Sequence, residues 1–155
     1  MYPQQHVIFG FLLALLLLFL FPEIGLLGAA TIFLSSFLID IDHYIYSAIK
    51  RKDYNPISII KWHYSIEKKF LGKSRKERSK YWVGWNFLHG FEILLLLLIF
   101  SFIFSIYFFY IFIGFLFHLI PDWIKDYSYQ DRLDKVSIVY DYFKYKKLKH
   151  IDILF

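Results

Sequence analysis

Residues 89–122 read HGFEILLLLLIFSFIFSIYFFYIFIGFLFHLIPD, an apolar block closed by a polar group at each end. His89 and Glu92 stand at its beginning, and His118 and Asp122 stand at its end. A carboxylate or imidazole beside hydrocarbon costs several kcal/mol unless it is paired or bound to a cation. The placement of these four residues therefore indicates a functional polar site and not part of an ordinary hydrophobic core.

The same arrangement occurs in the first part of the chain. Apolar runs at Val7–Phe21 and Ile24–Ile39 are flanked by His6 and by Asp40-Ile-Asp42-His43. Four polar clusters at the ends of apolar segments predict one shared, buried polar centre. We interpret it as a metal site embedded at a membrane boundary.

The composition and the charge pattern favour a membrane protein. The 155 residues are 58% hydrophobic and 23% aromatic, which is far above a soluble domain. Of the 18 Lys and Arg, 11 lie in 50–80 and the rest in 125–149. Basic segments beside charge-free apolar blocks follow the positive-inside rule, and they favour anionic lipid headgroups over nucleic acid as the partner. The absence of cysteine excludes disulfides and thiolate metal ligands.

The apolar blocks predict an all-α membrane protein with two helical hairpins, four helices in all, and interfacial helices. The expected divisions of this single domain, 1–155, are a hairpin at 7–43, a basic cytoplasmic loop at 44–85, a hairpin at 86–124 and a basic, aromatic tail at 125–155. The first run lacks a basic residue before it and a clear cleavage site, so we expect a retained helix and not a signal peptide.

Geometry favours two short helices over one long helix for the block at 89–122. A single straight helix would separate His89 from His118 by about 44 Å, at roughly 1.5 Å per residue. A turn near Ser101–Tyr107 returns both ends to one face, beside the basic segments, which the positive-inside rule places in the cytoplasm. Helices of this length reach only ~21–24 Å of the ~30 Å hydrocarbon core, so transmembrane and re-entrant hairpins both remain open.

Helical spacing brings the candidate ligands together in pairs. His118 and Asp122 are four residues apart, and Asp40 and His43 are three apart, so each pair shares a helix face. Imidazole mixed with carboxylate suits Zn²⁺ best, and Mn²⁺ or Fe²⁺ are possible. The residues suffice for one ion or two. The predicted metal ligands are His6, Asp40, Asp42, His43, His89, His118 and Asp122, and Glu92 and Asp42 are the predicted catalytic residues.

Simpler interpretations exist for each cluster. Asp42 and His43 are also typical of an interfacial helix cap, and His118 with Asp122 of a hydrogen-bonded pair between helices. A glutamate that opens a helix favours the helix dipole without any catalysis. His63 and His150 lie in basic, solvated stretches and are not expected to be ligands.

The order of these motifs resembles a family of bacterial and archaeal membrane-bound, metal-dependent hydrolases, the YdjM-like group. The corresponding residues are His6, Asp40-Ile-Asp42-His43, His89 and His118-Leu-Ile-Pro-Asp122. The family is distantly similar to zinc-dependent phospholipase C, so the resemblance implies a phosphoester or lipid substrate. Two departures stand out: Ile39 replaces the usual proline, and Asn86-Phe-Leu-His89 lacks the first His-Arg pair of the family's longer motif.

The sequence thus predicts a membrane-embedded, metal-dependent hydrolase that acts on a phosphoester of a lipid or of another membrane-proximal substrate. The alternative is a non-enzymatic membrane protein whose polar or metal centre is structural, or binds lipid or a partner. A closed site would favour the alternative, and a site that opens to a cleft would favour the enzyme.

Overall fold

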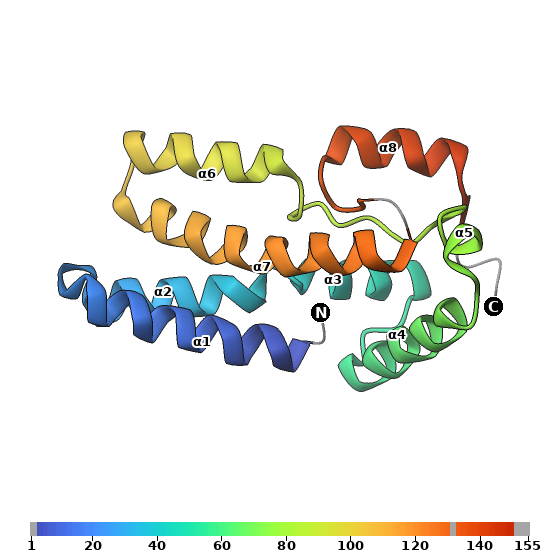
Figure 1. Ribbon diagram of the computed structural model, residues 1–155, viewed down its shortest axis with the longest axis horizontal. Coiled ribbons are helices and arrows are strands. Elements are labelled where there is room, and N and C mark those ends of the chain that lie inside the picture. Colours follow the sequence, from blue (N-terminus) through green and yellow to red (C-terminus); the bar gives the residue numbers. More distant parts are fainter. Residues whose placement is uncertain (1–2, 131–132, 151–155) are drawn as a thin grey trace.

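The computed structural model describes residues 3–130 and 133–150, and these are mostly helical (Figure 1). The helical elements in chain order are α1 (Pro3–Leu20), the 3₁₀ turn η1 (Pro22–Ile24), α2 (Gly25–Leu38), α3 (Ile41–Arg51), α4 (Pro56–Leu71), α5 (Arg75–Arg78), α6 (Phe91–Ile103), α7 (Ile106–Gln130) and α8 (Ile138–Lys147). Two short strands, β1 (Tyr81–Trp82) and β2 (Lys149–His150), pair in parallel.

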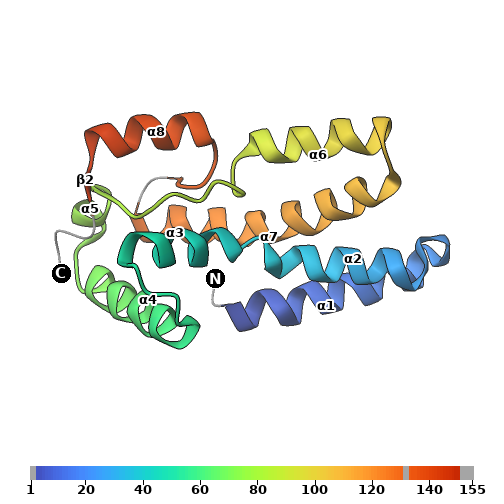
Figure 2. The same ribbon diagram turned by 180° about the vertical axis from the view of Figure 1, so that it is seen from behind.

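Four helices lie side by side in one half of the molecule, which we call the apolar half: α1, α2, α6 and the first part of α7, residues 106–117 (Figures 1 and 2). Helix α2 packs against α1 and α7, and α6 packs against α7. The second half, which we call the basic half, contains α3, α4, α5, α8 and the end of α7. Helix α7 is therefore the one element among those described that runs through both halves.

The two hairpin turns form where the sequence predicts them. Pro22 occupies the first position of η1, and Gly25 follows it with φ +66°, a left-handed conformation that glycine adopts without a Cβ clash. Between α6 and α7 the turn falls at Phe104 and Ser105. This turn confirms that residues 89–122 do not form one straight helix, and it brings both ends of the block back to the middle of the molecule.

Two helix boundaries differ from the expectation. The expected hairpin at 7–43 would extend its second helix to His43, but α2 ends at Leu38 and a separate helix begins at Ile41, so Asp40 lies in the break between them. Helix α7 continues past Pro121 to Gln130, beyond the end of the expected hairpin at 86–124. A proline lacks an N–H and disfavours the helical conformation of the residue before it, yet tertiary contacts of the flanking turns can hold the helix together.

Close packing in the apolar half depends on glycine and serine. A Cβ on Gly10 would overlap the hydroxyl of Ser36, and a Cβ on Gly114 would overlap the hydroxyl of Ser35. Both hydroxyls donate to carbonyl groups of α2 itself, Ser36 to Phe33 at 2.7 Å and Ser35 at 3.0 Å. Small residues that let helix backbones approach are typical of helix packing in lipid.

Large hydrophobic side chains point outward from the same half. Phe102 is 84% exposed, Phe19 82% and Leu26 80%. Two stretches, Pro22–Arg51 and Ile106–Tyr129, are long and apolar enough to cross a membrane, whereas α1 and α6 are apolar but shorter. The structure therefore contains two candidate membrane spans, and the full four-helix membrane arrangement stays a prediction.

Side-chain caps mark the starts of α4 and α5 in the basic half. Asn55 accepts from the N–H groups of Ile57 and Ser58 at the start of α4, where Pro56 stands in the first turn. Ser74 and Glu77 form a reciprocal capping box on α5. Within α4, Ile59 and Ile66 are buried, while Ile57 and Ile60 are exposed.

Candidate metal centre

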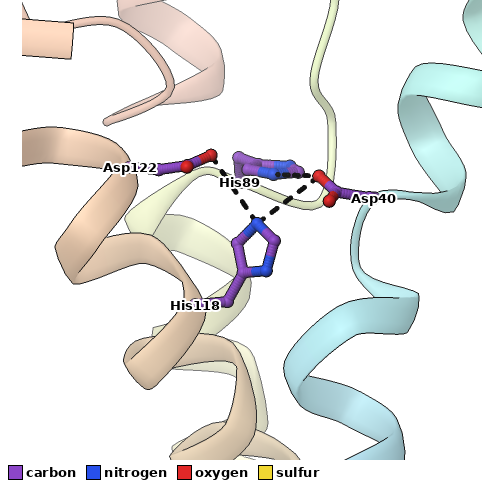
Figure 3. A group of neighbouring side chains, drawn as sticks. All are labelled: Asp40, His89, His118 and Asp122. Atoms are coloured by element: carbon purple, nitrogen blue, oxygen red, sulfur yellow. Dashed lines mark ion pairs between the residues drawn. The ribbon is translucent and has the colours of Figure 1, made fainter. Parts of the chain in front are cut away.

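Three separate chain segments meet at the boundary between the two halves (Figure 3). Asp40 comes from the break between α2 and α3, His89 from the loop that precedes α6, and His118 and Asp122 from successive turns of α7. One ligand-type atom from each of these four residues lies within 4.8 Å of the others. A group of this size and composition could hold a divalent metal ion.

The carboxylate of Asp40 is the centre of this group. Its Oδ1 atom lies 3.4 Å from the Nε2 atoms of both His89 and His118 (Figure 3). His118 Nε2 also lies 3.6 Å from Asp122 Oδ2. Two imidazole nitrogens and two carboxylates thus converge from different directions.

The opposite nitrogen of each imidazole is held by an acceptor. His118 Nδ1 donates to the backbone carbonyl of Ser36 at 2.8 Å, and His89 Nδ1 donates to Asp42 Oδ2 at 3.0 Å. A carbonyl or carboxylate oxygen accepts only, so the proton of the neutral imidazole lies on Nδ1. In that neutral form the lone pair of each histidine lies on Nε2, which faces Asp40. Histidine ligands of metals are oriented in this way by hydrogen bonds from their other nitrogen.

The Nε2 atoms of His89 and His118 have no hydrogen-bond partner within residues 3–130 and 133–150. Both side chains are fully buried. In the neutral form of these histidines the Nε2 lone pair faces a carboxylate oxygen, an arrangement that is costly when buried unless a proton or a metal cation lies between the two atoms. A cation between the nitrogens and the oxygen would remove that cost. The donor set fits Zn²⁺, and it also fits Mn²⁺ or Fe²⁺.

His6 and His43 flank this group on two sides. His6 Nε2 lies 3.3 Å from Asp122 Oδ1, and its ring stacks on that of His118 with 3.7 Å between centroids. His43 Nε2 lies 3.4 Å from Asp40 Oδ1, and its ring stacks on that of His89 at 4.7 Å. All seven predicted ligands therefore occupy one region, and three of them, His6, Asp42 and His43, lie outside the most compact group of four.

Asp42 lies behind the histidines. It is fully buried and accepts from the Leu88 N–H at 2.9 Å as well as from His89. Its other oxygen lies 3.1 Å from His43 Nδ1. A second compact group, Asp42 with His43 and His89, could also hold an ion. These contacts favour a role for Asp42 in orienting two imidazoles, because its oxygens already face their protonated nitrogens.

Glu92, the predicted general base, is bound to a different part of the chain. Its carboxylate accepts from the Ser137 hydroxyl at 2.6 Å and from the Ile138 N–H at 3.1 Å. Both bonds attach the start of α6 to the start of α8. The role of Glu92 as a base stays a prediction, and its contacts here are those of a helix anchor.

Lys135 is the residue of the centre that the sequence did not indicate. Its ammonium donates to Asp122 Oδ2 at 3.0 Å and to His43 Nε2 at 3.1 Å. Burial alone would lower the pKa of Lys135, but the carboxylates of Asp122, Asp126 and Asp40 outweigh it and hold the pKa above its usual range. Lys135 is one of many lysines in a basic tail without helical periodicity, so nothing in the pattern separates it from its neighbours.

A cleft of about 520 Å³ opens beside the centre. Asp40, His43, Asp122 and Lys135 line its polar end, and Ile59, Ile66 and Phe70 of α4 contribute to its apolar wall. His63, expected to be solvated, also lines it and shares a hydrogen bond with Ser47 at 3.0 Å. His150 lies elsewhere, against Tyr145 and Trp82. The centre is therefore buried on the α7 side and accessible from the cleft.

Comparisons of the chain with protein-family models, with curated proteins and with solved structures gave no match.

Proposed function

We propose that this protein is a membrane-embedded, metal-dependent hydrolase that acts on a phosphoester of a lipid or of another membrane-proximal substrate. The observation that carries the proposal is the orientation of His89 and His118. Each donates from Nδ1 to an acceptor and turns a buried Nε2 atom toward Asp40 Oδ1, at 3.4 Å. Such a group attracts a divalent cation more strongly than any single one of its members.

The four residues Asp40, His89, His118 and Asp122 would hold the ion, which we expect to be Zn²⁺. A divalent ion at this place supplies Lewis-acid chemistry and makes water a stronger nucleophile near neutral pH. Hydrolysis adds water across the P–O ester bond and yields an alcohol and a phosphate group. In this scheme the protein's own residues fix the geometry: Asp42 and the Ser36 carbonyl orient the imidazoles, and Lys135 provides a fixed positive charge at the polar end of the cleft.

The cleft supports an enzyme over a closed structural site. Four protein ligands are also the usual number in a closed structural zinc site, so an enzyme requires a further coordination position that is open to substrate. Here the side chain of Asp40 is 25% exposed and lines a cleft of a volume usual for small-molecule sites, about 300–1,000 Å³. The apolar wall on α4 suits a substrate with a hydrocarbon portion.

A membrane location is supported by the exposed hydrophobic side chains of the apolar half and by the two candidate spans. We propose an integral protein of the cell membrane with the centre on the cytoplasmic side, beside the basic half. The lysines of that half would attract anionic headgroups, at about 1 kcal/mol for each residue near the surface.

The alternative function is non-enzymatic, with the same centre as a structural link between the halves or as a site for lipid or a partner. The burial of His89 and His118 favours a structural link, because these side chains connect the loop before α6 to α7 and both contact Asp40.

The first experiment is elemental metal analysis of the detergent-purified protein beside its His118→Ala and His150→Ala variants. We expect bound ion in the wild type and in His150→Ala, and none in His118→Ala. The wild type should then hydrolyse phospholipids or a chromogenic phosphodiester, and His118→Ala should not. Absence of bound ion in the wild type after reconstitution with Zn²⁺, Mn²⁺ or Fe²⁺ would overturn the proposal. Bound ion without any hydrolysis would favour the alternative.

A further inference from the structure

The ammonium group of Lys135 occupies a place that a second metal ion would otherwise take. It lies between Asp122 Oδ2 and His43 Nε2, at 3.0 and 3.1 Å. These two atoms, with Asp40 Oδ1 at 3.4 Å from the same His43 nitrogen, are ligands that a second ion next to the first would need. The sequence left one ion and two ions equally open, because it has residues enough for both.

The hydrogen bonds of His43 show how its lone pair is used. An ammonium group can only donate, so His43 Nε2 accepts the hydrogen bond from Lys135. The proton of the neutral ring then lies on Nδ1, which is 3.1 Å from Asp42 Oδ1. His89 and His118 donate from Nδ1 to Asp42 and to the Ser36 carbonyl, and within the described residues their Nε2 atoms have no hydrogen-bond partner. Among these three histidines, His43 thus differs in having its metal-binding lone pair already occupied.

The backbone of Lys135 is also fixed in position. Its φ of +58° lies in the left-handed region, which a residue with a side chain adopts only when its surroundings require it. Its carbonyl oxygen accepts a hydrogen bond from Trp123 Nε1 at 3.0 Å. Trp123 follows the ligand Asp122 on α7. The same turn of α7 therefore binds both the backbone carbonyl and the ammonium group of Lys135. This positioning is more than a surface lysine needs for an ion pair.

We infer that the centre binds a single divalent ion, held by Asp40, His89, His118 and Asp122, and that the ammonium of Lys135 replaces a second ion. The inference rests on the metal centre of the proposed function. The site is then mononuclear, and the positive charge of Lys135 lies next to the ion on the side of the cleft. A charge of this kind binds an anionic substrate group without needing a second metal.

The test is the metal content of folded protein, measured by elemental analysis after equilibration with excess Zn²⁺ and removal of unbound ion. We expect one ion per chain in the wild type and in Lys135→Arg, which keeps the charge. We expect two in Lys135→Met, which frees His43 and Asp122 while it preserves the length of the side chain. Lys125→Met is the matched control, because Lys125 lines the same cleft but pairs with Glu67 at 3.2 Å, and it should bind one ion.

A second variant covers the case in which Lys135→Met does not fold. His43→Ala should retain one ion, because the lone pair of His43 serves the lysine and not the metal. Two ions in the wild type, loss of an ion in His43→Ala, or one ion in folded Lys135→Met would each overturn the inference. Zero ions in the wild type would instead overturn the metal centre itself, so the two failures are distinguishable.

Discussion

The apolar half and the basic half of this molecule use opposite means to hold their helices. In the apolar half, helices approach through Gly10 and Gly114, and hydrophobic side chains such as Phe102 remain on the outside. In the basic half, helices are capped by polar side chains and joined by ion pairs such as Lys125–Glu67. The first pattern suits a lipid environment, where burial of hydrocarbon between helices gains little, and the second suits water and headgroups.

The difference explains why the polar centre lies at the boundary. A carboxylate or imidazole within the apolar half would be expensive, and in the basic half it would be exposed to water. At the junction, the group comes from α7 and from the segments that follow α2 and precede α6, and a cleft opens beside it. The centre therefore combines burial with access.

The largest effect is expected from Asp40→Asn, which removes the negative charge at the meeting point of the two halves. Asp40 Oδ1 contacts two candidate ligand histidines, so loss of its charge should lower metal affinity more than ~100-fold, beyond the effect typical of an outer residue. The measurement is a competitive titration with a zinc chelator. Asp53→Asn is the control, because Asp53 contacts Arg51 and Ser58 in the basic half. Equal affinities for the two variants would remove Asp40 from the ligand set.

A lysine placed on each half tests whether their surroundings differ. Leu12 on α1 is 55% exposed and Ile57 on α4 is 63% exposed, so in water both substitutions by lysine would be tolerated. If the apolar half lies in lipid, Leu12→Lys should cost about 2.5–3.5 kcal/mol and reduce the membrane-inserted fraction. Ile57→Lys should leave it unchanged. Both fractions are measurable by carbonate extraction of membranes, and identical behaviour of the two variants would contradict the membrane assignment.

Asp42→Asn should weaken metal binding without removing a ligand. Asp42 orients His89 and His43 through their Nδ1 atoms, and loss of such an outer hydrogen bond typically costs 10–100-fold, roughly 1.4–2.7 kcal/mol. The same chelator titration checks it. An effect as large as that of Asp40→Asn would instead place Asp42 among the ligands.

A methyl group added to a glycine compares packing in the two halves. Gly114→Ala introduces a Cβ against the Ile32 carbonyl and the Ser35 hydroxyl, which should destabilise the fold by about 1–3 kcal/mol. Gly72→Ala, after α4, meets only ordinary contacts and has a helical φ of −67°, so little change is expected. Thermal unfolding in detergent measures both. An unchanged melting temperature for Gly114→Ala would contradict the close packing of α2 against α7.

The smallest effect concerns pH and Lys135. Its pKa is raised in the folded state, so its stabilising contribution is present in full below the unfolded pKa of about 10.4 and is lost as the pH rises through the folded value. The difference in unfolding free energy between wild type and Lys135→Met should therefore stay constant between about pH 6 and pH 9. Loss of that difference as the pH rises from about 8 to 9 would show that Lys135 is not a permanent cation, whereas a change near about pH 6–7 would reflect Asp126 and the histidines that Lys135 faces.

Part of the centre follows from local sequence and part does not. The pairing of His118 with Asp122 is a consequence of helical spacing, and the turns at Gly25 and near Ser105 follow from the polar or small residues there. The break at Asp40 was missed, because no proline or glycine marks the end of α2. The acceptor for His118 is a backbone carbonyl, that of Ser36, and every residue has one. Nothing in the residue pattern distinguishes it.

The sequence by itself determined where polar groups stand relative to hydrocarbon, and hence that His6, Asp40, His89 and His118 belong to one region. It could do so because water, lipid and helix periodicity act on each segment locally. Only the tertiary structure decided that Asp40 is the meeting point, that Asp42 lies behind the imidazoles, and that the ammonium of Lys135 contacts His43. Those facts depend on side chains from separate segments that pack within hydrogen-bond distance, and neither spacing nor composition specifies such contacts.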